Sequence, residues 1–448
     1  MFDQEKTYLF GKGETVKEIL DMEAMIVVTI FVISYVFLLL DKINRALIAA
    51  TGAALMVLFG VFSWDEALSS YVDWSTVALL FSMMVIISIT QRTGIFEFIA
   101  LWMIKKVSGQ PMALFFWIGI LTAIGSALLD NVTTVLLLVP VLLHMIRQLN
   151  LRAFPYLVNV IISSNVGGTA TMIGDPPNIM IGQAVPYFDF LDFIFHLGPV
   201  VVVIHTITLF LLYLMFKNSL IKGNQLDQEF VKTLNPNDSL KKTPLLYQSI
   251  TILLLTMVAF TLHGFLHIEL TTIAIMSALL MLLISENDES SEVVFQKVEW
   301  TTLFFFVGLF VLVGGLEKAG IIDQIAYTFI DWTDGDAFTS SLVILWSAGI
   351  LSGFVDNIPY VASMIPVIEE FEGFGVSPID PLWWALALGA CLGGNGSLLG
   401  ASANVVVAGI ASTHGEKIPF IKFMFYGLII VLLSLTISTV YVIGRYFL

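Results

Sequence analysis

The chain has 448 residues, of which 58% are hydrophobic and only 12% are charged. Because a soluble domain usually carries about 25% charged residues, this composition predicts an integral membrane protein and excludes an ordinary soluble one. The net charge of −15 comes without a basic patch, so nucleic acid is not an expected partner. The single cysteine, Cys391, excludes an internal disulfide and a cysteine-based metal site.

Apolar runs recur along the whole sequence, and many are about 20 residues long, the length that crosses a hydrocarbon core as a helix. Alternation with a period of two is weak, which argues against an outer-membrane barrel. The N-terminal segment 1–24 has no apolar core preceded by basic residues, so we do not expect a cleaved signal peptide. We predict an all-α, multi-pass protein of the cell membrane. The expected spans lie at roughly 25–40, 46–62, 75–90, 111–129, 132–146, 154–173, 196–216, 247–266, 271–285, 301–316, 339–355, 382–410 and 421–442.

The sequence contains an internal duplication. Asp130-Asn131 lies in an apolar stretch, and Asp356-Asn357 follows 226 residues later in another. The same offset links Trp74 to Trp300, Thr76 to Thr302, Gly94 to Gly320, Pro140 to Pro366, Gly167-Gly168 to Gly393-Gly394, Gly174 to Gly400 and Asn178 to Asn404. One unbroken offset through so many special positions indicates a duplicated unit. We predict a first repeat at 25–216, a cytoplasmic linker at 217–246 and a second repeat at 247–448.

Loop charges indicate how the two repeats are oriented. The loops of the first repeat carry Lys42, Arg45, Arg92, Lys105, Lys106, Arg147 and Arg152. The matching loops of the second carry Lys318 with Glu317, Asp323, Asp331, Asp334, Asp336, Glu369, Glu370 and Glu372. Under the positive-inside rule, equivalent loops lie on opposite sides of the membrane. This predicts inverted repeats with an odd number of spans, about five each. The acidic loop 286–299 disagrees, but acidic residues carry little weight in that rule.

The segment 110–146 has two interpretations. It forms either two complete spans with a short outer loop, or a re-entrant hairpin whose tip, Asp130-Asn131, stops at mid-membrane. Non-helical backbone at that depth is tolerated only where it lines a cavity, and the N-terminus of the second arm would favour an anion. A plainer interpretation makes Asp130 the N-cap of that arm, although its recurrence as Asp356 argues for more.

A broken helix is expected in each repeat, at 163–178 and at 393–404. Pro176-Pro177 cannot continue a helix without loss of backbone hydrogen bonds, and the glycines permit unwound turns. A broken helix exposes carbonyls for a cation and amides for an anion. Small residues that let helices pack closely explain Gly167-Gly168 about equally well, but they do not explain Asp175-Pro176-Pro177-Asn178.

These elements define the candidate site. Hard cations such as Na⁺ suit its oxygen atoms, whereas a desolvated aspartate would instead exchange a proton. The counterpart of Asp175 is Ala401, so the half-sites are chemically unequal and Asp175 is the first candidate for the proton or substrate role. The predicted substrate-binding residues are Asn131, Thr133, Asp175, Pro176, Pro177, Asn178, Asn357, Asn395, Ser402 and Asn404. The predicted ion-coupling residues are Asp130, Asn131, Gly174, Asp175, Asp356, Asn357 and Gly400.

The strings at 165–178 and 390–404 resemble the ion transporter superfamily, in particular its branch of arsenite permeases, P-protein-like carriers and citrate or dicarboxylate carriers. The resemblance implies a scaffold and a transport domain, a homodimer and elevator-type alternating access. In the dicarboxylate carriers a Ser-Asn-Thr motif at each tip binds Na⁺ and the substrate carboxylate. Here the tips have Asp130-Asn131-Val132 and Asp356-Asn357-Ile358, and the added negative charge opposes a dianion.

We therefore predict a secondary active transporter, not an enzyme, that uses H⁺ or Na⁺ to move a small anion or oxyanion-type solute such as arsenite. The alternatives are a Na⁺/H⁺ antiporter and a Na⁺-coupled di- or tricarboxylate (citrate) carrier, and more remotely a channel or an intramembrane aspartyl protease. The protease would need a Gly-x-Gly-Asp string, and each aspartate here is instead followed by asparagine. The expected partners are the lipid bilayer and a small solute, with no cofactor beyond the coupling ion.

Overall fold

The computed structural model describes residues 22–38, 40, 42–107, 110–149, 151–221, 235–286, 290–354 and 356–448, and within those ranges every regular element is helical. Contacts divide the chain into two compact units. The first contains the described residues up to Val77 with Trp300–Ser340 and Ala362–Ile379, and the second contains Ala78–Glu299, Ser341–Val361 and Asp380–Leu448. Each unit takes segments from both halves of the sequence, so the compact units are not the two predicted repeats.

In the first unit, α2 (Arg45–Leu58) packs closely against α15 (Trp300–Lys318). A Cβ atom added to Gly308 of α15 would lie 2.6 Å from the carbonyl carbon of Ala49 in α2. Small residues at this contact let the two backbones approach, as in many membrane helix pairs. The helices of this unit are Met22–Leu38, α2 (Arg45–Leu58), α3 (Trp64–Glu66), η1 (Ala67–Tyr71), α15 (Trp300–Lys318) and α16 (Ile321–Thr333), with parts of α17 and α18.

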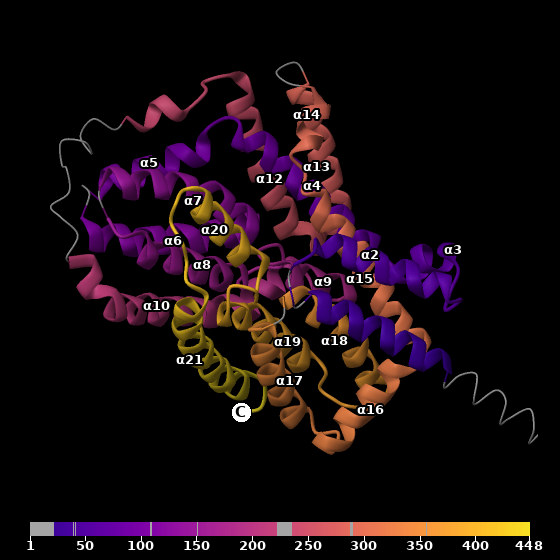
Figure 1. Ribbon diagram of the computed structural model, residues 1–448. Coiled ribbons are helices and arrows are strands. Elements are labelled where there is room, and N and C mark those ends of the chain that lie inside the picture. The colour runs from indigo at the N-terminus through magenta and orange to yellow at the C-terminus, as the bar shows by residue number, and fades with distance from the viewer. Residues whose placement is uncertain are drawn as a thin grey trace, which may run out of the picture. The chain divides into compact units, whose positions relative to one another are not determined.

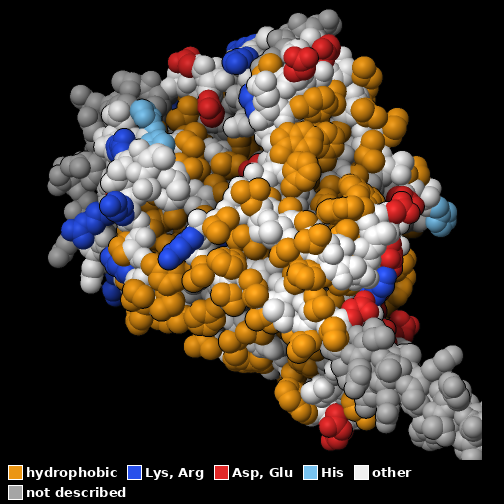
Figure 2. Space-filling view, turned by 45° about the vertical axis from the view of Figure 1, so that its right-hand side comes forward, with side chains coloured by type: hydrophobic (Ala, Val, Ile, Leu, Met, Phe, Trp, Pro, Cys, Tyr) orange, Lys and Arg blue, Asp and Glu red, His pale blue; other side chains and the backbone are white. Residues whose placement is uncertain are grey.

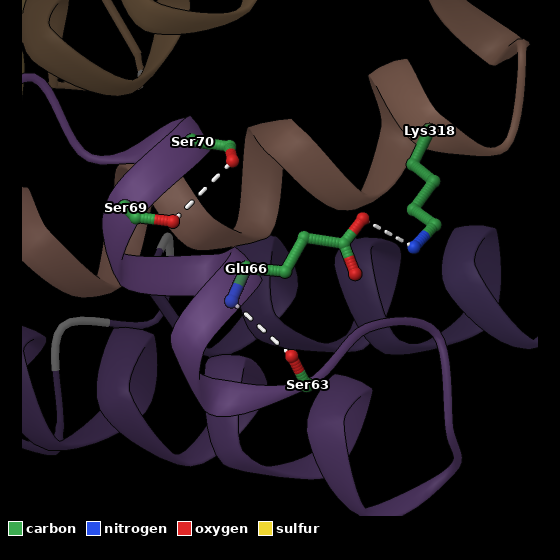
Figure 3. Close-up of polar contacts among 5 residues, drawn as sticks. All are labelled: Ser63, Glu66, Ser69, Ser70 and Lys318. Atoms are coloured by element: carbon green, nitrogen blue, oxygen red, sulfur yellow. Dashed lines mark hydrogen bonds and ion pairs between the residues drawn. The ribbon is translucent and has the colours of Figure 1, made fainter.

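A polar contact joins α3 to the end of α15 in this unit (Figure 3). Nζ of Lys318 lies 2.5 Å from Oε1 of Glu66, and Oγ of Ser63 caps α3 by accepting a hydrogen bond of 3.2 Å from the Glu66 amide. Both charged side chains are about one third exposed, at 31% and 38%. Lys318, the single basic residue of the three second-repeat loops that match the basic loops of the first repeat, is therefore paired with a carboxylate of the first repeat.

The second unit holds the paired helices and broken segments expected to carry function (Figure 1). Within it α6 packs against α8, and α7 packs against both α8 and α20. Its helices are most of α4 (Trp74–Gln91), α5 (Ile95–Lys106), α6 (Pro111–Leu129), α7 (Asn131–Gln148), α8 (Ala153–Gly168), α9 (Pro176–Ala184), α10 (Phe190–Ile221), η2 (Pro236–Ser239), α12 (Pro244–Leu266), α13 (Leu270–Ser285), α14 (Ser291–Gln296), most of α17 (Ala337–Ser352), the start of α18 (Asn357–Gly373), α19 (Asp380–Gly393), η3 (Gly394–Gly396), α20 (Ser402–Thr413) and α21 (Phe420–Tyr446).

Helix starts keep the offset of 226 residues along the chain. This offset separates the first residues of α4 and α15, α5 and α16, α6 and α17, α7 and α18, and α9 and α20. Several of these first residues have the same identity, as with Trp74 and Trp300 or Asn131 and Asn357. The order of elements is therefore duplicated along with the sequence.

The multi-pass prediction is confirmed. Among the described residues, seven helices are long and apolar enough to cross a membrane, or eight if α16 and α17 form one bent span. The apolar helices carry large outward side chains, and Leu58 of α2, Phe265 of α12 and Leu283 of α13 are at least 75% exposed. Figure 2 shows many hydrophobic side chains on the visible face. Such surfaces are stable only against hydrocarbon or another protein.

Two predicted boundaries can be compared with the structure. The apolar run 382–410 contains the break that the sequence predicts at 393–404, because α19 ends at Gly393 and α20 starts only at Ser402. The linker predicted at 217–246 is shorter at both ends, because α10 continues to Ile221 and α12 begins at Pro244. Residues 222–234 of the linker and residues 1–21 of the N-terminal segment lie outside the described residues.

Candidate functional site

The first broken helix ends at Gly168 and resumes at Pro176. Nδ2 of Asn178 closes the break by donating to the carbonyls of Thr169, at 3.1 Å, and Thr171, at 2.9 Å. Gly168 and Gly174 face each other across it, and a Cβ on either would lie within 2.5 Å of the other's carbonyl oxygen. Two proline residues begin α9, where a missing amide hydrogen costs nothing. Pro176 and Pro177 therefore shape the break, and their rings are buried.

The second broken helix repeats this construction. Nδ2 of Asn404 donates to the carbonyls of Gly394, at 2.7 Å, and Ser397, at 2.9 Å. A Cβ on Gly400 would lie 2.7 Å from the carbonyl oxygen of Gly394. Asn404 and Gly400 are therefore the structural counterparts of Asn178 and Gly174, as the offset predicts.

Asn165 joins the two breaks. Its Nδ2 donates to Oδ1 of Asn395, at 3.0 Å, and to Oδ1 of Asn404, at 2.9 Å. The residue at the equivalent position of the second repeat is Cys391, whose Sγ donates to Oδ1 of Asn178 at 3.5 Å. All five side chains are fully buried. Equivalent residues thus make equivalent contacts, strong amide bonds on one side and a weak thiol bond on the other.

The two Asp-Asn tips reach the same region of the second unit. Nδ2 of Asn131 lies 3.5 Å from Oδ1 of Asn165, and its carbonyl accepts a 3.0 Å bond from Ser164. Nδ2 of Asn357 lies 3.3 and 3.2 Å from the two carboxylate oxygens of Asp175. The structure therefore brings together Asn131, Asn357 and Asp175 with the asparagines of the breaks.

Asp175 holds a distinct position, because it precedes α9 without capping it. Among the described residues its side chain makes no cap hydrogen bond, and it contacts Asn357 and Cys391 instead. It is 1% exposed, and a buried carboxyl group is costly unless a partner compensates it. Its counterpart Ala401 offers no such group to Asn131.

The two remaining aspartates lie at the hairpin tips. Asp130 has a positive φ of 116°, a strained conformation for a residue other than glycine. Its carboxylate caps α7, accepting from the amide of Thr133 at 2.7 Å and from its hydroxyl at 2.6 Å. The structure therefore contains the N-cap that the plainer interpretation assigns to Asp130. The amide and the hydroxyl of Thr133 are both engaged in this cap. Asp356 accepts a 2.8 Å bond from Oγ of Ser402, at the start of α20.

Two buried amide atoms have no hydrogen-bond partner in the part of the chain that the structure describes: Oδ1 of Asn131 and Nδ2 of Asn395. Both side chains contact Asn165, so the open acceptor and the open donor belong to one cluster. Buried polar groups in native proteins are nearly always paired, and each exception calls for an explanation such as a bound molecule. The cluster is therefore the best candidate for a ligand site.

The sequence reasoning missed Asn165 and Cys391 as site residues. Both lie at the end of the helix that precedes a Gly-Gly pair, and the offset of 226 makes them equivalents. When the two repeats are aligned, these two positions differ in chemistry while the glycines beside them match. That difference is the signal that would have identified them. Their role depends on contacts between the repeats, which sequence spacing alone does not give.

Replacing Asn165 with alanine is expected to destabilise the protein by about 2 kcal/mol, because it leaves the buried amide oxygens of Asn395 and Asn404 without their donor. Cys391→Ala is the matched control at the equivalent position, where the contact with Asn178 is weak. Thermal unfolding in detergent measures both. Equal melting temperatures for the two variants would contradict the bridging role of Asn165.

Comparison with known proteins agrees with this architecture and confirms the resemblance. The citrate transporter family matches residues 35–389. A 46 kDa membrane protein of Mycobacterium leprae is 36% identical over 428 residues, covering 94% of this chain and 99% of that protein. An uncharacterized transporter of Mycobacterium tuberculosis is 38% identical over 429 residues, covering 95% and 99%. The P protein of Mus musculus is 30% identical over 489 residues, covering 91% of this chain and 59% of that protein. The chain therefore belongs to the citrate transporter family and is a multi-pass membrane transporter.

Proposed function

We propose that the protein is a secondary active transporter that uses an H⁺ or Na⁺ gradient to move a small anion or oxyanion-type solute. The observation that carries this proposal is the buried cluster around Asn165, with its open acceptor on Asn131 and open donor on Asn395. A few convergent polar groups in an otherwise apolar interior are typical of small-molecule sites. In transporters such sites lie where broken helices of two repeats meet.

The two repeats are inverted in this proposal. Helix starts at a constant offset and the matching roles of Asn178 and Asn404 support the duplication, while the loop charges support the inversion. Inverted repeats bring two broken helices to one midplane site from opposite faces. The bonds from Asn165 to Asn395 and Asn404 join the breaks as such a site requires.

Each Asp-Asn tip belongs to a re-entrant hairpin in this proposal. Asn131 and Asn357 are only 2% exposed, and they contact Asn165 and Asp175. An outer loop between two complete spans would instead be solvated. Backbone that leaves the helical form at membrane depth is tolerated when it is buried in protein, as these tips are.

Coupling rests on Asp175. It is a buried carboxyl group that faces an amide rather than a cation, so a proton or a Na⁺ ion would compensate its charge. Asp130 and Asp356 are further candidates for ion coupling. They rank below Asp175 because their oxygens already accept hydrogen bonds from Thr133 and Ser402. The resemblance adds a homodimer and elevator-type movement to the proposal.

Two alternative functions differ from this proposal in the solute that is transported. A Na⁺/H⁺ antiporter would use Asp175 for both ions. Citrate, which names the family, carries several negative charges that Asp130, Asp175 and Asp356 would repel unless they were neutralised. A neutral hydroxide such as arsenous acid, the main form of arsenite at neutral pH, meets no such repulsion and suits the amide donors and acceptors.

Solute counterflow in proteoliposomes tests the proposal. Vesicles preloaded with unlabelled arsenite, citrate, succinate or chloride are diluted into the labelled solute, after a thermal-shift screen has selected the solute that stabilises the protein. A carrier accumulates label transiently and saturably. Ohmic current without counterflow would indicate a channel, and cleavage of a peptide substrate would indicate a protease; either result would overturn the proposal.

A further inference from the structure

A second feature of the second unit is a cavity whose lining includes none of the asparagines of the amide cluster. Five helices, α4, α5, α6, α7 and α12, enclose a cavity of about 390 Å³. Its lining is apolar apart from two threonines, Thr90 and Thr134. The Thr90 hydroxyl is already bonded to the carbonyl of Ile86 at 2.8 Å. Apolar cavities of this kind exclude water and accept apolar ligands.

The mouth of the cavity opens between α6 and α12. Ile124 and Leu128 of α6 are 55% and 45% exposed, and Leu254 of α12 is 60% exposed. Both helices are long and apolar enough to cross the bilayer. The medium at the mouth is therefore hydrocarbon, and an acyl chain is the apolar ligand present there at high concentration.

A basic site lies at one end of α12, at the distance that a lipid headgroup requires. Lys241 and Lys242 are exposed and immediately precede the helix. The Lys241 amide donates to the carbonyl of Thr93 at 3.0 Å, which fixes this segment beside the start of α5. Leu254 lies ten residues into α12, about 15 Å along its axis, and half of the hydrocarbon core is also about 15 Å.

The charged residues beside the start of α12 determine which lipid headgroup is favoured. Asp238 is the acidic residue in the preceding turn, and its carboxylate is bonded to Nδ2 of Asn235 at 2.7 Å. Arg92 and Glu97 at the start of α5 offset each other in charge, so Lys241 and Lys242 outweigh Asp238, and basic residues near the membrane surface attract anionic lipid. We infer that an anionic phospholipid binds here, with its headgroup at Lys241 and Lys242 and one acyl chain in the cavity.

The site has a consequence for the hairpin. Leu128 and Leu129 of α6 and Leu137 of α7 line the cavity, so the acyl chain contacts both arms behind the Asp130 tip. Any movement of the hairpin against α12 would change the shape of the cavity. The bound lipid is therefore placed to favour one position of the hairpin over another.

Native mass spectrometry of the full-length, delipidated protein tests the inference with dioleoyl phosphatidylglycerol and dioleoyl phosphatidylcholine. The wild type is expected to retain one phosphatidylglycerol per protomer at least about tenfold more tightly than phosphatidylcholine, a difference of ~1.4 kcal/mol. Leu254→Trp blocks the mouth and removes this binding. Leu255→Trp is the matched control, because Leu255 is 59% exposed on the same helix but does not line the cavity.

Two further variants keep the test decisive. Ile124→Trp blocks the mouth from α6 and replaces Leu254→Trp should that variant not fold. Lys241→Gln with Lys242→Gln is expected to lower phosphatidylglycerol binding to the level of phosphatidylcholine. Equal loss in Leu254→Trp and Leu255→Trp, or wild-type binding indifferent to headgroup charge, would overturn the inference.

Discussion

Replacing Asp175 with asparagine is expected to abolish gradient-driven transport while the protein stays folded. The amide retains the shape of the carboxyl group, and Nδ2 of Asn357 still finds an oxygen within reach of its present 3.2–3.3 Å contacts. The group that carries a proton or holds Na⁺ is lost. The expected fall in coupled transport is about a hundredfold, the effect of removing ~3 kcal/mol of interaction with a charged group.

The measurement is initial solute uptake into proteoliposomes, accompanied by thermal unfolding to show that the fold is intact. Asp331→Asn is the matched control, because Asp331 is an exposed residue of α16 and its substitution should leave uptake unchanged. Uptake in Asp175→Asn that keeps the wild-type dependence on pH and Na⁺ would contradict the coupling role of Asp175.

Gly174→Ala is expected to destabilise the protein. A Cβ at this position would lie 2.5 Å from the carbonyl oxygen of Gly168 and 2.9 Å from that of Ser126. Both neighbours are backbone atoms of packed segments and have no flexible side chain that could yield. Overpacking of this kind costs about 1–3 kcal/mol, and the break at 169–175 would have to open.

A second glycine provides the control. Gly409 lies within α20, and a Cβ there would meet nothing within 4 Å. Gly409→Ala should leave stability unchanged or raise it by up to about 1 kcal/mol, because alanine favours a helix. Thermal unfolding in detergent measures both variants. A melting temperature of Gly174→Ala equal to that of Gly409→Ala would show that the glycine contact does not hold the break closed.

Much of this architecture follows from periodic and positional features of the sequence. The length of the apolar runs predicts the helices, and Pro176-Pro177 places the end of the first break at the residue where α9 begins. The duplication also transfers correctly, since Asn404 closes its break as Asn178 does. These features depend on the local backbone preferences of individual residues and short segments, which can be inferred from the sequence alone.

Contacts between distant segments were beyond such reasoning. Asn165 acts through Asn395 and Asn404, more than 200 residues away, and nothing in its local sequence predicts those bonds. The division into compact units also crosses the repeats, because α2 packs on α15 of the other repeat. Asp130 shows the converse, since its bonds to Thr133 are local and follow from helix capping.

The most direct test of secondary active transport is solute accumulation against its own gradient. Proteoliposomes that contain the wild-type protein are given equal solute on both sides and an imposed H⁺ or Na⁺ gradient. The proposal predicts that the solute becomes concentrated on one side, and that an ionophore which dissipates the driving gradient reverses this. Solute that stays equal on both sides under either ion gradient, in vesicles whose counterflow shows that the protein is active, would contradict it.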